Sequence, residues 1–213
     1  MVSILLNLIG ERYLIDQMDI GDLSTLKTSV MNFSIQAYKV IGLGHVSVMC
    51  DEDVLGLMKM DTLIVNPYEI DLPLLSYDRI YTPTDDTLIF ELYDTVVGFY
   101  SEDNLISIKS EYQDIPDRDT RTQWYDTIKL SSSISKNGRS DQQSRIDELT
   151  VRFFKAYLSS ASKVGSISKR LQKTRDYVEG LLKHGGPSTD VFVKEFGIQK
   201  TARLYRTILF GTE

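Results

Sequence analysis

The sequence contains few of the residues that build metal and disulfide sites. Cys50 is the only cysteine, His45 and His184 are the only histidines, and no Cys-x-x-Cys pair occurs. A single cysteine cannot form an intrachain disulfide, and so few nitrogen and sulfur ligands leave no recognisable zinc or iron–sulfur site. If the chain takes part in redox chemistry, we therefore expect it to bring no metal cluster of its own.

Long apolar runs and linkers rich in Gly, Ser or Pro are also lacking. The apolar start from Val2 to Ile9 is short and runs into Glu11 and Arg12, so we predict neither a signal peptide nor a membrane span. With 213 residues, 42% of them hydrophobic, the chain is long enough for one sizeable core. We predict a single domain over residues 1–213, in a cytoplasmic monomer.

The formal net charge of −6 conceals a split between two parts of the chain. Residues 1–150 hold 12 Lys and Arg against 25 Asp and Glu, whereas residues 151–213 hold 12 against 5. A basic face beside a site steers an acidic partner protein onto it, although solvated helix faces explain the same pattern more simply. The basic residues are spaced and few aromatics interleave with them, which argues against nucleic acid.

Period-two patterns in the first two-thirds predict strands. From Ser29 to Val40, apolar residues alternate with polar ones, as in a half-buried strand. Short connections between successive strands predict antiparallel neighbours. We predict a helix at 3–18, strands at 29–40, 45–50, 55–65, 96–108 and 124–130, turns at 42–44 and 51–53, an irregular loop at 109–122, and a flexible polar turn at 131–141.

The last third is predicted to be helical. Two apolar stripes at helical spacing mark the helices: Ile146, Leu149, Phe153, Tyr157 and Ala161, then Ile167, Leu171, Val178 and Leu182. Gly185-Gly186-Pro187 then interrupts the chain, Ser188 suits the N-cap of a short helix, Gly197 suits its end, and a last helix spans 199–209. Strands followed by helices predict an α+β fold, an antiparallel sheet covered by helices.

The stretch from Asn66 to Asp94 has the most interpretable ionisable residues. It is predicted to form a β-hairpin with its turn at Pro83 to Asp86. In the second strand Leu88, Phe90 and Leu92 face one side, while Thr87, Ile89, Glu91 and Tyr93 face the other. Asp78 and Glu91 therefore lie on paired strands, where they could face a shared pocket.

This stretch resembles the ferredoxin-dependent bilin reductases, a family related to red chlorophyll catabolite reductase. The resemblance rests on Asp71-Leu72-Pro73 followed by Asp78, and on an acidic residue thirteen positions further on, here Glu91. Phe196-Gly197, a helical stretch and Leu209-Phe210 are similar to the closing signature of the family. Together the two blocks span about half of the chain.

The resemblance implies a three-layer α/β/α sandwich that reduces a linear tetrapyrrole such as biliverdin in a pocket between the sheet and the C-terminal helices. Two electrons would come one at a time from reduced ferredoxin, an acidic partner for the basic C-terminal face. No bound cofactor is implied, because the pigment itself holds the unpaired electron. The chemistry needs a carboxylic acid that a partly apolar pocket keeps protonated near neutral pH.

The resemblance also implies roles for four residues. Asp78 is the candidate proton donor, and a turn-capping or Arg79-paired aspartate is the structural alternative. Glu91 matches the acidic position that contacts the pigment, or is an exposed strand glutamate. Arg139 is the candidate clamp for a propionate, or a surface arginine. Thr62 stands in the pocket where some relatives have a catalytic histidine.

Other positions depart from the family pattern. The acidic partner on the preceding strand falls at about Cys50, and Gly186 precedes Pro187 where some relatives have an aspartate. These departures leave two alternatives open: a non-catalytic tetrapyrrole carrier and a reductase of an open-chain chlorophyll catabolite. Cys50 could attach a bilin, but we expect a buried strand cysteine. We expect His45, at a strand start, to be a turn histidine and not a ligand, and His184 to cap a helix end.

Overall fold

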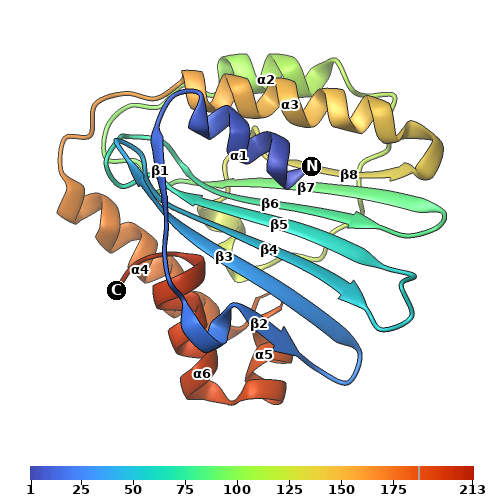
Figure 1. The fold of residues 1–213 in the computed structure, drawn as a ribbon. Coiled ribbons are helices and arrows are strands. Elements are labelled where there is room, and N and C mark those ends of the chain that lie inside the picture. Colours follow the sequence, from blue (N-terminus) through green and yellow to red (C-terminus); the bar gives the residue numbers. More distant parts are fainter. Residues whose placement is uncertain (187) are drawn as a thin grey trace.

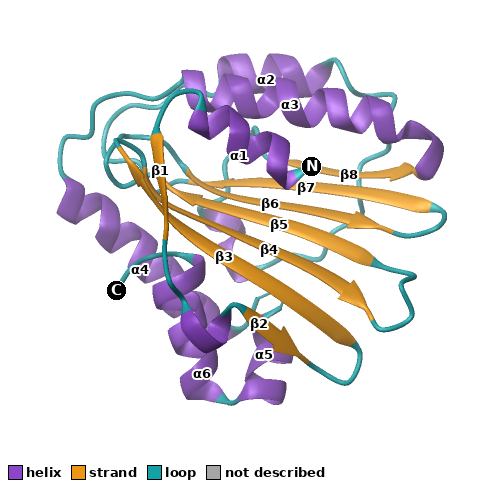
Figure 2. Ribbon diagram, viewed as in Figure 1, coloured by secondary structure: helices purple, strands orange, loops and turns teal. Residues whose placement is uncertain are grey.

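A central antiparallel sheet runs through the molecule, with helices on both of its faces (Figures 1 and 2). The structure is a computed structural model that describes residues 1–186 and 188–213, so the predicted break at Pro187 lies outside the described residues. The predicted α+β sandwich with a central antiparallel sheet is confirmed.

The sheet has eight strands in the described part of the chain, and every pair of neighbours is antiparallel, as the short connections predicted. The strands are β1 (Leu14–Gln17), β2 (Thr25–Lys27), β3 (Met31–Ile41), β4 (Gly44–Asp53), β5 (Lys59–Asn66), β6 (Leu74–Tyr81), β7 (Asp85–Tyr93) and β8 (Ile134–Arg139). They lie in the order β1-β3-β4-β5-β6-β7-β8, and β2 pairs with the other end of β3.

The helices form two layers. Helices α1 (Val2–Gly10), α2 (Asp103–Ser110) and α3 (Gln143–Ser159) cover one face. Helices α4 (Ile167–His184), α5 (Thr189–Phe196) and α6 (Ile198–Arg203), with a π-helical turn at Leu204–Leu209, cover the other (Figure 1). None of the described helices has the length and apolar character needed to cross a bilayer.

The buried face of α3 is mostly apolar, whereas that of α4 includes polar side chains. On α3 the predicted residues Ile146, Leu149, Phe153 and Tyr157 are buried, which confirms that stripe. The stripe predicted for α4 is only partly right: Val178 is buried and Leu182 partly buried, but Ile167 is exposed, and the buried face is Arg170, Thr174, Tyr177, Val178 and Leu181. Arg170 can lie inside because its guanidinium donates to the Leu72 carbonyl at 2.6 Å and to the Thr174 hydroxyl at 3.0 Å.

The predicted N-terminal helix at 3–18 ends at Gly10, and Leu14–Gln17 forms strand β1 on the edge of the sheet. Ile15 lies opposite Val40 of β3. Over so short a segment the spacing of Tyr13 and Ile15 fits the period of a helix as well as that of a strand. The pairing with β3 therefore decides the structure.

Three predictions between residues 96 and 141 are wrong. Residues 96–108 are not a strand, since Leu105 and Ile108 pack from α2 at helical spacing. Trp124–Thr127 is a turn of 3₁₀-helix where a strand was expected. The polar segment 131–141 contains β8, which pairs with β7 at the sheet edge. Its inward side holds Lys136, whose ammonium donates to the Ile115 carbonyl at 3.0 Å, so the strand lacks an apolar pattern.

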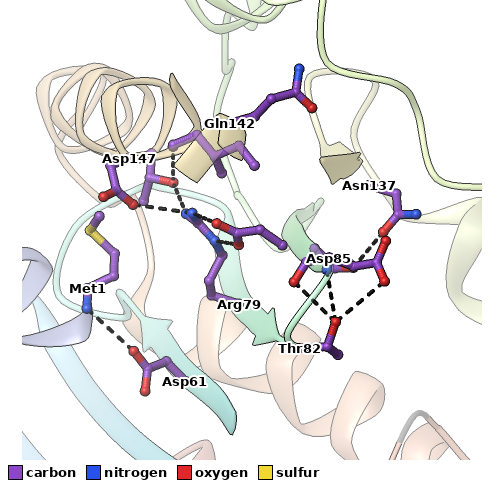
Figure 3. A network of polar contacts seen from close by, with 12 residues as sticks. Met1, Asp61, Arg79, Thr82, Asp85, Asn137, Gln142 and Asp147 are labelled. Atoms are coloured by element: carbon purple, nitrogen blue, oxygen red, sulfur yellow. Dashed lines mark hydrogen bonds and ion pairs between the residues drawn. The ribbon is translucent and has the colours of Figure 1, made fainter. Parts of the chain in front are cut away.

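A buried ion pair ties the central hairpin to α3 (Figure 3). Arg79 of β6 is fully buried, and its guanidinium holds both carboxylate oxygens of Asp86 on β7. The same guanidinium reaches Asp147 at 3.2 Å and the Thr150 hydroxyl at 3.5 Å, both on α3. Arg79 therefore faces away from Asp78, which rules out the expected alternative of an Asp78–Arg79 pair.

We predict that Arg79→Met lowers the free energy of unfolding by roughly 3–5 kcal/mol, because Asp86 is left buried without its partner. Urea denaturation followed by circular dichroism measures the loss. The double variant Arg79→Met with Asp86→Leu should recover much of it, since no buried charge then remains unpaired. Arg139→Met is the matched control, because the exposed Arg139–Asp141 pair contributes little. Equal midpoints for Arg79→Met and wild type would contradict the role of the pair.

Candidate functional site

A row of polar side chains crosses the sheet on the face covered by α4 to α6. Alternation along each strand puts Thr62 of β5, Ser76 and Asp78 of β6, and Glu91 of β7 on this face. Thr62 pairs with Asp78 and Ser76 pairs with Glu91. Asp78 and Glu91 are thus diagonal neighbours, and the prediction that they face a shared pocket is confirmed.

Two cavities meet at these carboxyl groups. An inner pocket of about 70 Å³ lies between the sheet and the C-terminal helices, and an outer cleft of about 560 Å³ opens beside it. Asp78, Glu91 and Ser188 line both. The inner pocket is otherwise walled by apolar and aromatic side chains: Met49, Ile64, Tyr93, Tyr177, Leu181, Phe192, Tyr205, Leu209 and Phe210. Ser188, predicted as a helix cap, forms no side-chain capping bond and faces the cavities.

The carboxyl of Asp78 is half-buried, and Thr62 lies directly opposite it on β5. The Thr62 hydroxyl donates to Oδ1 of Asp78 at 2.5 Å. Burial raises the pKa of Asp78 to about 6, the Thr62 hydrogen bond and the more distant charge of Arg118 oppose the rise, and Glu91 adds to it. This carboxyl can therefore hold a proton at mildly acidic pH, where an exposed aspartate is ionised, and it borders both cavities.

Glu91 is held by two neighbours instead of being exposed. The hydroxyl of Tyr93 donates to Oε2 at 2.5 Å, and the ammonium of Lys129 lies 3.5 Å from Oε1. Asp78 and Glu91 thus have different partners, a hydroxyl for Asp78 and a hydroxyl with an ammonium for Glu91.

The outer cleft has an apolar floor and a cationic rim. Met60, Ile80 and Ile89 on β5, β6 and β7 form the floor. Arg118 and Arg121 reach it from the loop before the 3₁₀-helix, and Lys129 lies at its side. The backbone N–H of Arg118 donates to the Ser135 carbonyl of β8 at 3.0 Å, which anchors this loop beside the sheet.

Arg139 is not brought together with the other predicted site residues. It ends β8 opposite Asp85 of the hairpin turn, its side chain is 75% exposed, and it pairs with Asp141. It lines neither cavity. The arginines that line the outer cleft are Arg118 and Arg121. The sequence offered no signal for them beyond two cations in a polar loop.

Asp51 is a buried acidic residue that the sequence analysis placed in a turn. Strand β4 continues through Asp53, so Asp51 lies in the sheet on the same face as Asp78. It is 4% exposed, and among the described residues its carboxylate forms no hydrogen bond of normal geometry, only a weak contact with the backbone N–H of Met60. Burial and the charges of Asp78 and Asp61 raise its pKa to about 7, although the backbone N–H of Met60 opposes the rise.

The C-terminal segment that walls the inner pocket is fixed by three side chains of the sheet. His45 Nε2 lies 2.7 Å from the Ile208 carbonyl, the Ser47 hydroxyl donates to the Leu209 carbonyl at 2.7 Å, and the Asn66 amide donates to the Phe210 carbonyl at 2.7 Å. His45 lies at the start of a strand, as predicted, but it is buried in the sheet and is not a turn histidine; burial lowers its pKa.

The Asp71-Leu72-Pro73 motif has a structural role. The buried Asp71 carboxylate accepts hydrogen bonds from the backbone N–H groups of Val97 at 2.9 Å and Gly98 at 2.6 Å. The Tyr157 hydroxyl of α3 donates to the Pro73 carbonyl at 2.9 Å, and Arg170 of α4 binds the Leu72 carbonyl. The motif therefore joins the two helical layers at the start of β6 and fixes the strand that positions Asp78.

The remaining ligand-type residues lie away from the cavities. Cys50 is half-buried and packs against the core on the opposite face of the sheet. His184 ends α4 as expected and lies against Trp124, with ring centres 5.8 Å apart. Within the described residues no three His, Cys, Asp or Glu side chains are grouped so that they could hold a metal ion.

Comparison with known proteins finds likeness in structure and not in sequence. No protein-family model and no curated protein sequence matches the chain. Among solved structures, phytochromobilin synthase from tomato, crystallised in complex with biliverdin, matches with a TM-score of 0.78 at 12% sequence identity. The match covers 99% of this chain and 82% of the tomato chain. The resemblance to the bilin reductases is thereby confirmed at the level of the fold.

Proposed function

We propose that the chain binds a linear tetrapyrrole, biliverdin or a related bilin, and reduces it with electrons from reduced ferredoxin, using Asp78 as proton donor. The observation that carries the proposal is the half-buried Asp78 carboxyl, with a pKa of about 6, where an apolar pocket meets a larger cleft. The shared fold supports it, because the tomato enzyme binds biliverdin.

The cleft suits a flat, conjugated molecule with acidic substituents. Its volume of about 560 Å³ lies within the range of roughly 300–1,000 Å³ typical of small-molecule sites. The apolar floor of Met60, Ile80 and Ile89 would contact pyrrole rings, while Arg118 and Arg121 on the rim would bind the two propionates. In this proposed arrangement the ring system would lie over Asp78, with the propionate carboxylates near solvent.

Reduction of one double bond requires two electrons and two protons. Ferredoxin supplies one electron at a time, so the pigment holds the unpaired electron between the two steps. Each added electron makes the pigment more basic, and a positioned carboxylic acid can then protonate it. Asp78 contributes by holding a proton within the site, and Thr62 contributes by orienting Asp78 through its hydrogen bond.

The helices over the cleft provide a surface for an acidic electron donor. Helices α4 and α5 cover the same sheet face as the cleft (Figure 1). Lys169, Lys183 and Lys194 on these helices are exposed, and none forms an ion pair with any residue in ranges 1–186 and 188–213. Exposed cations of this kind accelerate docking of an acidic protein in low salt.

We predict that Asp78→Asn lowers the rate of biliverdin reduction by roughly 10²–10⁴-fold, because an amide cannot donate the proton. Binding should change little, since the amide keeps the size of the carboxyl. The measurement is anaerobic absorption spectroscopy with ferredoxin and a reducing system, after an absorption titration of binding. Asp85→Asn, on the same hairpin but outside both cavities, is the control.

Full activity of Asp78→Asn would contradict the assigned role. Binding of biliverdin by the wild type without any reduction would exclude the reductase and leave a tetrapyrrole-binding carrier. A second titration, with an open-chain chlorophyll catabolite, distinguishes the remaining alternative substrate class. Absence of binding to either pigment would exclude all three functions.

We predict that Arg118→Gln and Arg121→Gln each weaken biliverdin binding by about tenfold, because each removes a charge-assisted bond to a propionate worth about 1.5 kcal/mol. Arg139→Gln serves as the matched control and should leave the dissociation constant unchanged, since Arg139 lines neither cavity. Absorption titration measures all three. Weaker binding in Arg139→Gln alone would instead restore the clamp expected from the sequence.

A further inference from the structure

Trp124 is the only tryptophan of the chain, and it attaches the loop with the two cleft arginines to helix α4. Its indole packs over Gly180 of α4, and its ring N–H donates to the Gly185 carbonyl just after that helix at 2.9 Å. The indole also lies against Tyr177 and His184, with ring centres 5.9 Å and 5.8 Å away. Trp124 lines neither cavity, so the proposed function gives it no role.

The absence of a side chain at Gly180 makes room for the indole. A Cβ atom at this position would lie 2.7 Å from Cζ3 and 2.8 Å from Cζ2 of Trp124, which is closer than carbon atoms pack. Glycine inside a helix lowers the stability of that helix relative to alanine. The contact with Trp124 is a physical reason for a glycine at this point of α4.

The loop before Trp124 is held at its two ends. At one end the backbone N–H of Arg118 bonds to strand β8. At the other end the backbone N–H of Gln123 donates to the carboxylate of Asp126 at 2.8 Å, and the indole of Trp124 follows directly. Between these anchors, residues 119–122 form no hydrogen bond or ion pair within the described structure. The position of this segment therefore depends on its anchors.

We infer that Trp124 is a positioning residue that holds Arg121 in place to bind a carboxylate of the pigment, and that it thereby favours pigments with free propionates over esterified ones. This inference rests on the proposed function, in which Arg121 binds a propionate. Arg121 lies in the segment without bonds of its own, three residues before Trp124. Ordering a loop and a long side chain on binding costs conformational entropy. An anchored loop has lost part of that freedom before the pigment binds.

The two arginines of the rim should depend on Trp124 to different degrees. Arg118 is bonded to β8 through its own backbone N–H, so it keeps its place when the far end of the loop is released. Arg121 has only the anchor at Trp124 nearby. An indole that merely stabilised the fold would change the free energy of unfolding without changing which pigment is bound.

We predict that Trp124→Leu weakens binding of biliverdin about tenfold, as Arg121→Gln does, and leaves binding of biliverdin dimethyl ester unchanged. The ester keeps the ring system but lacks both carboxylate charges. During reduction of biliverdin, KM should rise about tenfold with little change in kcat, because ground state and transition state lose the same bond. Absorption titrations and steady-state rates measure these effects. An equal loss for both pigments would overturn the inference.

Gly180→Ala tests the packing while keeping the indole, and it decides the question if Trp124→Leu does not fold. Alanine favours the helix, but its Cβ displaces the indole. We predict a red shift in the fluorescence of Trp124 together with a reduced preference for biliverdin over its ester. Gly165→Ala is the control, because a Cβ there meets no atom within 4 Å. Unshifted emission, or shifted emission with the preference retained, would overturn the inference.

A double-mutant cycle separates the two arginines. Trp124→Leu with Arg121→Gln should bind biliverdin no more weakly than Arg121→Gln alone, because both changes remove the same bond. Trp124→Leu with Arg118→Gln should weaken binding about a hundredfold, the product of two independent losses. Losses that multiply in the first pair would overturn the link to Arg121. A wild type that binds neither pigment would refute the proposed function, whereas a wild-type preference for biliverdin that Trp124→Leu and Gly180→Ala both retain would refute only the positioning role.

Discussion

Strand β6 buries neighbouring residues of opposite charge on its two faces, and the rest of the structure depends on how each is satisfied. Arg79 points into the core against α3, where Asp86 neutralises it. Asp78 points the other way, where its closest partner is the Thr62 hydroxyl, not a cation. A buried carboxyl with no cation beside it favours its protonated form. The alternation that orders the sheet thus places the buried ion pair of Arg79 and the carboxyl of the candidate site on opposite faces, one residue apart.

The sequence predicted the elements correctly wherever the pattern of apolar residues matches the side chains that are buried. The β6–β7 hairpin, the facing of Asp78 and Glu91, and the buried residues of α3 follow from periodicity, because apolar side chains there all turn toward one core. The prediction failed where a polar side chain is buried. In β8 the buried Lys136 interrupts the apolar alternation that would indicate a strand. In α4 the buried face includes the polar residues Arg170 and Thr174, so it does not show an apolar stripe. The run of acidic residues at Asp51 suggested a turn, but this segment belongs to β4.

The sequence also did not predict which arginines line the cleft. Arg139 stood at the position that the family resemblance indicated, but it ends an edge strand whose existence the sequence did not reveal. Arg118 reaches the cleft because its loop bonds to that same strand. Loop positions depend on such long-range backbone contacts, which leave no local signal in the sequence. The position of the central carboxyl groups was therefore easier to predict than the cations that line the cleft beside them.

Asp51 has no role in folding that an apolar residue could not fill. Its neighbours on β3 and β5 are Phe33 and Met60, so a side chain of similar size without charge would pack there and avoid the desolvation of a carboxyl. The strand itself is held by backbone pairing on both sides and by the bonds from His45 and Ser47 to the C-terminal segment. A destabilising group inside an otherwise well-supported element is what a functional constraint produces.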